Sequence, residues 1–410
     1  MKIAILSKAD ASGGGASRVA QELRELLEAG GHTAHHFVSL SSASQKPGTR
    51  HLYGHPLLGK AVRKANSLLT QAGFPELIPW ELFFLHLNKI QTYDLLHFHD
   101  LSSAISPFTV RFLSRSVPTV WTFHDCSPFT GGCLYPMVCT NFTTRCGQCP
   151  QLGQWPINSK FDFTGLMQDI KRKTARENRF VPVTPSAWLA AVAAGSGMFA
   201  APVQVIPNGV DTNVFQPVHR AAVKQTLGLP TSQPVVLITA AHIHEERKGV
   251  RFALKALQQI KHLEPCLLIV GHLDDESRAA FAEFQTHPTG YLQDDHLKSH
   301  YFAAADVHLF TSLADNMPLT VLETMATGTP TVGFATGGVP EMIDHCYSGY
   351  LAPPQDVAGL VRGLYQGLVD GQAPLWGQNA RVTVEQRYSH QIFLKNHLAL
   401  YEKVIHSRHQ

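Results

Sequence analysis

Residues 311–341 have the sequence TSLADNMPLTVLETMATGTPTVGFATGGVPE and follow a short apolar run, VHLF (residues 307–310). We interpret the region as a strand, a loop, a helix, a second strand and a glycine-rich turn, because apolar residues recur at helical spacing in its middle. Pro318 suits the first turn of this helix, Gly328 suits its C-terminal cap, and Pro330 prevents its continuation. Such a helix start offers free backbone N–H groups and the positive end of the helix dipole. The stretch therefore predicts an α/β fold with a corner suited to a phosphate.

The length of the chain, 410 residues, is too great for one ordinary core and predicts two or three domains. Its apolar content of 44% and charged content of 16% are typical of a globular protein. A net charge of +3 is too small to indicate nucleic-acid binding. No run approaches the roughly 18 apolar residues of a membrane span, and no long apolar segment of a signal peptide follows MKIAIL. We therefore expect a cytoplasmic enzyme.

The N-terminal region predicts the opening of a doubly wound α/β domain. An apolar run at residues 2–7 is followed by three glycines, an amphipathic segment at about 16–29 and a second strand-like run at 32–39. Gly14 and Gly15 lie where a helix should begin, so their backbone can approach a phosphate or a sugar closely. The glycines do not match the G-x-G-x-x-G pattern of dinucleotide-binding proteins. A tight strand-to-helix turn without a ligand is the alternative reading.

Two later strand-like runs both end in His-Asp. They are YDLLHFHD (residues 93–100) and PTVWTFHD (residues 118–125). The carboxyl ends of parallel strands meet at the edge where α/β proteins bind ligands. For both His124 and His99, a site role and a polar group satisfied at a strand end are the alternatives; they remain equal for His99, and for His124 the resemblance described below favours a site role.

Four cysteines follow with the spacing Cys133-x5-Cys139-x6-Cys146-x2-Cys149. In a cytosolic chain, clustered cysteines suggest metal or redox chemistry before structural disulfides. The C-x2-C knuckle and the total of four thiols predict a closed, structural zinc site. Free thiols in a small apolar subdomain and oxidised pairs are the alternatives.

Residues 41–93 combine a basic helix, with Lys60, Arg63 and Lys64, and an apolar aromatic run, FPELIPWELFFLHLNKI (residues 74–90). Basic and aromatic side chains of this kind dock to anionic lipid or capture an acceptor. Core helices with a solvated basic rim are the alternative. The first interpretation predicts peripheral contact with the inner face of a membrane through the N-terminal domain.

The eight-residue separation of Asp315 and Glu323 resembles the E-x7-E region of retaining glycosyltransferases of family 4, with Asp in place of the first Glu. Lys248 and the glycine after it resemble the end of that family's G-R-L-x-x-x-K-G pattern. Ile243 takes the position of the arginine of this pattern, and Arg247 lies beside the lysine. The cysteine-bearing stretch resembles an insertion in the polysaccharide-biosynthesis subgroup of the family, of the colanic-acid type.

The resemblance implies the GT-B architecture, in which two Rossmann-like doubly wound α/β domains face each other across a cleft. We place an N-terminal, acceptor-side domain at residues 1–200, with a cysteine-bearing insertion at 126–150. A donor-binding domain takes residues 201–389. The C-terminal helix, residues 390–410, is expected to pack back on the first domain.

The resemblance further implies a retaining hexosyltransferase-type enzyme that moves a sugar from a nucleotide-diphosphate sugar to a glycan or lipid-linked acceptor in polysaccharide or glycoconjugate biosynthesis. Glu323 would hold the nucleotide ribose, and Lys248 would neutralise the leaving diphosphate. Asp315 would hydrogen-bond the donor sugar, and His124 would contact that sugar from the other domain. The predicted catalytic residues are His124, Asp315 and Lys248. The predicted donor-binding residues are Gly14, Gly15, Arg247, Lys248, Asn316, Met317, Pro318, Leu319, Thr320 and Glu323.

No catalytic divalent metal is expected, because a lysine and a helix dipole can neutralise the diphosphate. Two other functions fit the same architecture. One is a nucleotide-sugar epimerase, which shares the phosphate-binding corner. The other is a two-domain sugar-binding protein.

Overall fold

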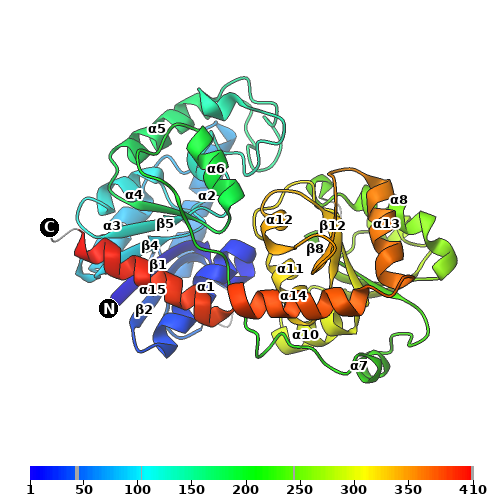
Figure 1. Cartoon of the computed structure of the whole chain (residues 1–410). Helices are drawn as coiled ribbons and strands as arrows, with labels where there is room; N and C mark the ends of the chain where they lie inside the picture. Colours follow the sequence, from blue (N-terminus) through cyan, green and yellow to red (C-terminus); the bar gives the residue numbers. More distant parts are fainter. Residues whose placement is uncertain (42–45, 103, 243–244, 408–410) are drawn as a thin grey trace. The chain divides into compact units, whose positions relative to one another are not determined.

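The computed structural model of the chain describes residues 1–410 except 42–45, 103, 243–244 and 408–410, so Ile243 lies outside the described residues. The chain divides into two compact units (Figure 1). The first unit is Met1–Pro207 with Leu394–Gln410, and the second is Asn208–Phe393. Each unit contains one parallel sheet with helices packed on it, so the predicted class of two Rossmann-like α/β domains is confirmed. We predicted the boundary between the domains after residue 200, and the break between the two units follows Pro207.

The first unit has a seven-stranded parallel sheet in the order β3-β2-β1-β4-β5-β6-β7. Its strands are β1 (Lys2–Ala9), β2 (Thr33–Leu40), β3 (Thr49–His51), β4 (Leu95–Phe98), β5 (Thr119–Thr122), β6 (Val181–Thr184) and β7 (Gln204–Val205). Its α-helices are α1 (Gly15–Ala29), α2 (Pro56–Gln71), α3 (Trp80–Leu87), α4 (Pro107–Leu113), α5 (Thr164–Arg176), α6 (Ala187–Gly195) and, from Leu394 onward, α15 (His390–His406).

The second unit has a six-stranded parallel sheet in the order β10-β9-β8-β11-β12-β13. Its strands are β8 (Val235–His242), β9 (Cys266–His272), β10 (Gln285–Gly290), β11 (Val307–Phe310), β12 (Thr331–Phe334) and β13 (Gly349–Ala352). Its α-helices are α7 (Arg220–Thr226), α8 (Val250–Gln259), α9 (Asp275–Ala280), α10 (Asp295–Ala304), α11 (Leu319–Ala326), α12 (Val339–Met342), α13 (Val357–Leu368) and α14 (Ala373–Arg387).

Both sheets begin in the middle, grow outward on one side and then cross to the other side. The strands that meet at this crossing are β1 and β4 in the first sheet, and β8 and β11 in the second. In open α/β sheets, ligands bind beyond the carboxyl ends of the strands at such a switch point. The loops after these four strands therefore position the candidate sites.

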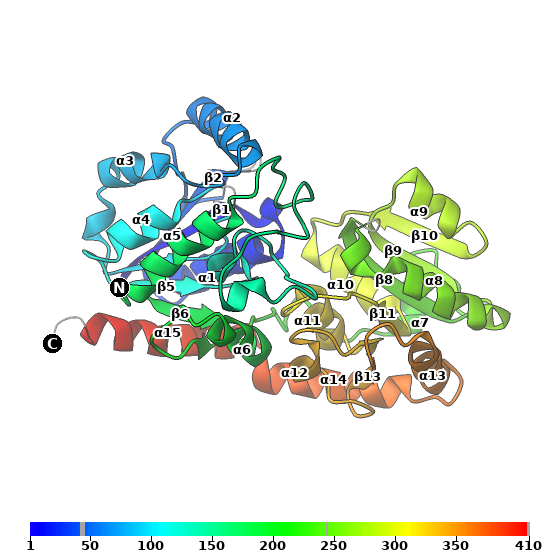
Figure 2. The ribbon, with the colours of Figure 1, turned by 90° about the horizontal axis from the view of Figure 1, so that it is seen from above.

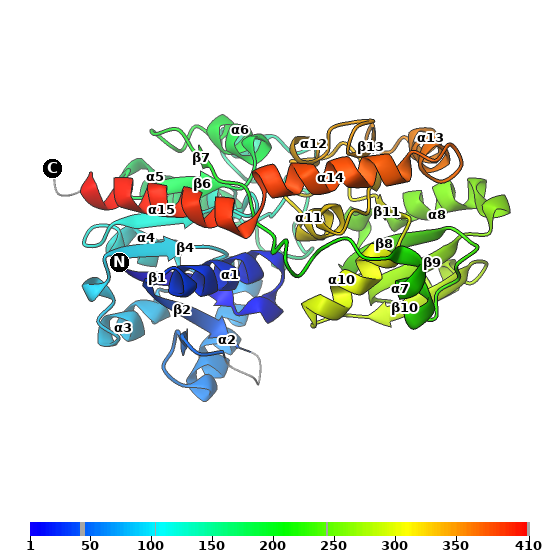
Figure 3. The ribbon, with the colours of Figure 1, turned by 60° about the horizontal axis from the view of Figure 1, so that its bottom comes forward.

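Alternating side chains along the strands of the second sheet pack into two separate cores. Val235 and Leu237 of β8 belong to one cluster, whereas Val236 and Ile238 of the same strand belong to the other. This alternation arises because successive side chains of a strand point to opposite faces of the sheet. The first cluster continues into α10 and α11, and the second into α8 and α13, which lie side by side (Figures 2 and 3).

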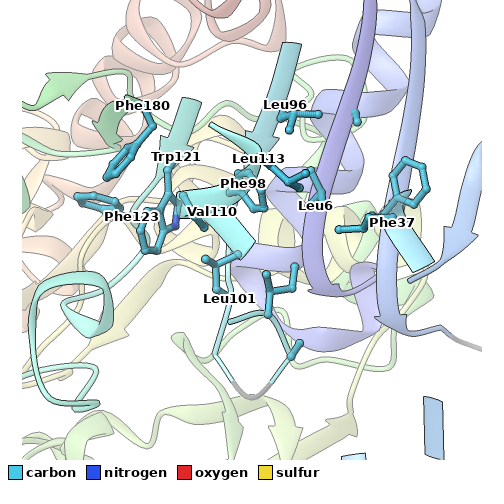
Figure 4. Packing of buried hydrophobic residues seen from close by; sticks show 14 of the residues in the cluster. Leu6, Phe37, Leu96, Phe98, Leu101, Val110, Leu113, Trp121, Phe123 and Phe180 are labelled. Atoms are coloured by element: carbon cyan, nitrogen blue, oxygen red, sulfur yellow. The ribbon is translucent and has the colours of Figure 1, made fainter. Parts of the chain in front are cut away.

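The first sheet also has two covered faces. On one face, Leu96 and Phe98 of β4 pack with Leu113 of α4 (Figure 4). Burial of each such side chain contributes about 1.5–3 kcal/mol. His97, which lies between them in β4, points to the other face, where its Nδ1 lies 2.6 Å from the hydroxyl oxygen of Tyr401 in α15. Both faces of β4 are therefore packed, so the loop that follows β4 begins from a fixed position.

Candidate functional site

Two cations converge on Asp315, in the loop that follows β11. Lys248 Nζ donates to Asp315 Oδ2 at 2.9 Å, and Arg247 Nη1 donates to the same oxygen at 3.4 Å. Ser312 Oγ lies 3.3 Å from this oxygen as well. Burial alone would raise the pKa of Asp315, but Lys248 and Arg247 outweigh it and lower the pKa below its usual value. Asp315 therefore stays ionised and holds both cations at the carboxyl ends of β8 and β11.

Two glycines let the backbone close around this ion pair. Gly249 has a φ of 66°, and a Cβ atom there would lie 2.1 Å from the carbonyl oxygen of Thr311. Gly337 has a φ of 57°, and its Cβ atom would lie 1.7 Å from the carbonyl oxygen of Asp315. Both positions therefore require glycine, for the conformation and for the space. The glycine-rich turn after β12 thus supports the loop that carries Asp315.

Helix α11 begins at Leu319, directly after this loop. The sequence placed Pro318 in the first turn, but Pro318 has a ψ of 123° and precedes the helix as its N-cap residue. The N–H groups of Leu319 and Thr320 lie in the first turn, where no intrahelical acceptor reaches them. At the other end Gly328, with a φ of 74°, follows the C-cap as predicted.

Asn316 and Met317 lie on the inner side of the same loop and are buried. The carbonyl oxygen of Met317 accepts a hydrogen bond from Asn208 Nδ2 at 3.0 Å, and Met317 Sδ lies 3.2 Å from the Asn208 nitrogen. These contacts fix the backbone that leads into α11. The predicted contact of Asn316 and Met317 with a donor stays a prediction.

Glu323 lies inside the second unit, where its exposed fraction is 2%. Its Oε1 accepts a hydrogen bond from Lys298 Nζ of α10 at 2.9 Å. Lys298 also lies 3.0 Å from Asp295 Oδ1, and its Nζ stands 5.2 Å from the centre of the Phe215 ring. The sequence reasoning missed Lys298. The sequence offered one signal for this residue, a lysine within the short helical run DHLKSHYFAA. Its partner, Glu323, lies 25 residues further along the chain, beyond the reach of a local pattern.

The glycine loop of the first unit ends at Gly14, the N-cap residue of α1, which has a φ of 100°. Among the described residues, no atom lies within 4 Å of the position that a Cβ atom of Gly14 would take. Helix α1 begins at Gly15, one residue before the predicted start. The role of both glycines in holding a donor stays a prediction.

His99 and His124, which follow β4 and β5, lie against each other. The distance between His99 Nδ1 and His124 Nε2 is 3.0 Å, and the ring of His97 stands 4.1 Å from that of His99. Burial lowers the pKa of His124 to about 4 and that of His99 well below its usual value. Both imidazoles are therefore neutral near pH 7. His99, which the sequence left open, is the direct neighbour of His124, whose contact with a donor sugar stays a prediction.

The four predicted zinc ligands line one small space in the first unit and are free thiols. Burial raises the pKa of Cys133 to about 12 and holds those of Cys146 and Cys149 above their usual value. Gly131 donates its backbone N–H to Cys146 Sγ at 3.3 Å. In the part of the chain that the structure describes, no group of three or more His, Cys, Asp or Glu side chains is arranged to hold a metal ion. The zinc prediction for Cys133, Cys139, Cys146 and Cys149 therefore finds no support.

Comparison with known protein families gives two matches. The model described as Glycosyltransferase Family 4 matches residues 13–214, and the model described as Glycosyl transferases group 1 matches residues 233–370. The amylovoran biosynthesis glycosyltransferase AmsK of Erwinia amylovora is 28% identical over 170 residues, which are 37% of this chain and 41% of AmsK. The chain spans about half the length, or less, of the first curated relatives that it matches.

Solved structures share the fold over almost the whole chain. Sucrose-phosphate synthase from Thermosynechococcus elongatus has a TM-score of 0.74 at 21% identity and covers 99% of both chains. HepE from Anabaena, solved with UDP-glucose, has a TM-score of 0.68 at 18% identity and covers 98% of this chain and 100% of its own. At these identities the likeness shows the fold.

Proposed function

The chain belongs to the glycosyltransferases that join a family 4 segment to a group 1 segment, and from this membership we propose that it moves a sugar from a nucleotide-diphosphate sugar to a glycan or lipid-linked saccharide. The product serves polysaccharide or glycoconjugate biosynthesis; AmsK is named for amylovoran biosynthesis. The two family matches support a glycosyltransferase. Our proposal adds the type of donor, the acceptor and the retained stereochemistry.

The observation that carries the proposal is the pair of cations held by Asp315. Lys248 and Arg247 stand at the switch point of the second sheet, at the carboxyl ends of β8 and β11. An arriving diphosphate can replace Asp315 as their partner, because phosphate oxygens accept charge-assisted hydrogen bonds as carboxylates do. The first turn of α11 adds N–H groups and a positive dipole end. This combination favours a nucleotide diphosphate over a neutral ligand.

In the proposed reaction the bond between the anomeric carbon and the diphosphate oxygen breaks. The acceptor hydroxyl forms its new bond on the same face of the sugar, so the anomeric configuration is retained. The acceptor proton passes to the leaving diphosphate, whose charge Lys248 and Arg247 stabilise. No covalent intermediate and no carboxylate base is required.

Glu323 is the proposed ligand of the nucleotide ribose. Lys298 positions its carboxylate by binding Oε1. Asp315, once its cations turn to the diphosphate, offers Oδ2 to the hydroxyl groups of the donor sugar. The alternative of a nucleotide-sugar epimerase would use the same cations but would need no acceptor.

The test begins with the melting temperature of the full chain in the presence of UDP, GDP or ADP. We expect one nucleotide to raise it, and UDP is the first choice because HepE was solved with UDP-glucose. The matching nucleotide sugar is then incubated with acceptor saccharides, and the anomeric protons of the product are followed by NMR. Interconversion of the donor without an acceptor would indicate the epimerase. Binding of free sugar with no response to any nucleotide would indicate a sugar-binding protein.

The proposal includes contact between the first unit and an anionic lipid surface. Helices α2 and α3, joined by the hydrogen bond from Trp80 Nε1 to Asn66 Oδ1, expose several large apolar side chains. These are Leu57, Leu58, Leu68, Phe83 and Leu87. Lys60 and Lys64 are exposed on α2, which carries no acidic residue. Among the described residues, no helix is long and apolar enough to cross a bilayer.

A further inference from the structure

A row of polar side chains runs from α15 along the first sheet to the carboxyl ends of β4 and β5. On β4 the row contains His97, and His99 follows two residues later with its ring centre 4.1 Å away. On the neighbouring strand β5 it contains Thr122, and His124 follows two residues later. His97, His99 and Thr122 are buried. Because a buried polar group is costly unless it is hydrogen-bonded, the partners of these side chains show what they do.

Tyr401 of α15 lies at one end of this row. Its hydroxyl oxygen is 2.6 Å from His97 Nδ1, and His97 Nε2 is 2.8 Å from Thr122 Oγ1. Among the described residues, neither hydroxyl group has another hydrogen-bond partner. Tyr401 is fully buried, whereas Thr122 lines a cavity of about 880 Å³ of empty space, its solvent-open part included. The chain from Tyr401 to Thr122 is therefore closed at one end and meets a cavity at the other.

Both Tyr401 and His97 are uncharged near pH 7. Burial raises the pKa of Tyr401 well above its usual value, so the hydroxyl keeps its hydrogen. Burial and the neighbouring His397 and His124 lower the pKa of His97 well below its usual value. The His97 imidazole therefore carries a hydrogen on one ring nitrogen and a lone pair on the other. The three groups can be hydrogen-bonded in two directions only.

The surroundings favour the direction that starts at Tyr401. In this direction Tyr401 donates to Nδ1, His97 donates from Nε2 to Thr122, and the hydroxyl hydrogen of Thr122 can point into the cavity. In the reverse direction His97 donates from Nδ1 to Tyr401, whose own hydrogen then stays in the closed interior without an acceptor. A buried donor without an acceptor is unfavourable. The phenol is also the more acidic of the two hydroxyl groups and hence the stronger donor.

We infer that Tyr401 is a positioning residue, which sets the tautomer of His97 and so makes Thr122 a hydrogen-bond donor towards the cavity. The ring of His97, held at both nitrogens, also packs on His99, whose Nδ1 lies 3.0 Å from His124 Nε2. Tyr401 therefore acts on the site beyond β4 and β5 through other side chains. The direction of the hydrogen bonds rests on this geometry alone, whereas their effect on sugar transfer rests on the proposed function.

The first test reads the tautomer of His97 by NMR of the full chain with isotope-labelled histidine rings. We expect the hydrogen on Nε2 and a bare Nδ1, whose nitrogen signal moves when Tyr401→Phe removes its donor. Tyr53→Phe is the matched control, because it removes another buried hydroxyl group of the first unit, which donates to the carbonyl oxygen of Ala104 at 2.9 Å. This control should leave the signal in place. A hydrogen on Nδ1 in the wild type, or no imidazole signal that responds to Tyr401→Phe, overturns the inference.

The second test measures transfer with the donor that the melting-temperature screen identifies. Tyr401→Phe and Thr122→Val should each lower kcat about three- to tenfold, which is the effect of one neutral hydrogen bond, with KM for the nucleotide sugar little changed. Thr122→Ser, which keeps the hydroxyl group, should lose less than Thr122→Val. Because both changes interrupt the same chain, the double variant should lose no more than the larger single loss. Losses that multiply, or an equal loss in Tyr53→Phe, would overturn the positioning role.

The two tests separate this inference from the proposed function. If no nucleotide sugar is turned over, the proposed function fails, and the histidine signals still decide the direction of the hydrogen bonds. If transfer proceeds and Tyr401→Phe has the kcat of the wild type, the positioning role of Tyr401 is wrong and the proposed function stands.

Discussion

The two candidate sites treat charge in opposite ways. In the second unit, basic and acidic side chains form ion pairs, Lys248 with Asp315 and Lys298 with Glu323. In the first unit, two neutral imidazoles lie beside a carboxylate, that of Asp125, which accepts hydrogen bonds from its own loop. A pair of opposite charges can exchange one partner for an anionic ligand, whereas neutral imidazoles offer hydrogen bonds without a net charge.

The largest effect should come from breaking the buried pair in the second unit. Lys298→Met removes the cation and leaves the Glu323 carboxylate buried beside an apolar side chain. Loss of one partner of such a pair typically costs about 3–5 kcal/mol of stability. Native-state hydrogen exchange of the amides in α10 and α11 measures this change without assuming that both units unfold together.

A double variant separates the lost pair from simple damage to packing. Lys298→Met combined with Glu323→Leu has no buried charge, so it should recover most of the stability that Lys298→Met loses. Normal exchange in Lys298→Met alone would contradict the pairing. No recovery in the double variant would mean that the lysine acts through its packing on Phe215.

The next effect concerns the cations on Asp315. Lys248→Ala should reduce kcat/KM for the nucleotide sugar about 10²- to 10³-fold, because one charge-assisted donor to the leaving diphosphate is lost. Its stability should change less, since Arg247 still faces Asp315. Lys255→Ala, which removes an exposed lysine from α8, is the matched control. Unchanged turnover of Lys248→Ala in the same assay would remove this lysine from the proposed mechanism.

These contacts mark the limit of what local sequence patterns predict. The end of α11 just before Gly328 followed from residue types that cap or punctuate helices, and such signals act over a few residues. The partner of Glu323 did not follow, because Lys298 belongs to another helix and meets it only when α10 and α11 pack together.

The first unit teaches the same limit from its histidines and cysteines. The position of His99 after β4 was readable, but its contact with His124 depends on β4 and β5 being neighbours in the sheet. The spacing of Cys146 and Cys149 matched a zinc knuckle, and the four thiols do line one small space, but among the described residues no group is arranged to hold a metal ion. The compositional signal could not reveal that the same stretch lines a cavity.

A smaller effect should appear on acidification, and it should appear first in the first unit. Burial lowers the pKa of His36 to about 3 and of His124 to about 4, whereas in the second unit that of His308 is lowered to about 3. An unfolded histidine binds its proton near pH 6.5, so from pH 6.5 down to these values the unfolded chain binds more protons and the free energy of unfolding falls. Burial raises the pKa of Glu81 to about 7 and of Asp125 to about 6, and these groups act in the opposite sense as pH falls from 7 to about 4.

His97 and His99 are also buried histidines of the first unit whose pKa values are lowered. As pH falls, the loss of stability from the buried histidines of this unit should therefore exceed the gain from Glu81 and Asp125. Hydrogen-exchange pulses at one fixed pH, after incubation at pH 6.5, 5 and 4, should show β4 and β5 opening before β11. Earlier opening of β11 would contradict this order.

The smallest effect concerns the outer surface, where the units differ again. In the first unit, α2 and α3 present exposed apolar side chains together with Lys60 and Lys64, and each lysine near an anionic membrane contributes about 1 kcal/mol of binding. Lys60→Gln with Lys64→Gln should therefore weaken sedimentation with phosphatidylglycerol-containing vesicles about 30-fold at low salt, and Lys255→Gln on α8 should not. Because salt screens charge but not apolar contact, the difference between the variants should shrink at high salt while the residual binding depends on Leu68 and Phe83. Equal sedimentation of the wild type and the double variant would contradict the proposed contact between α2 and an anionic bilayer.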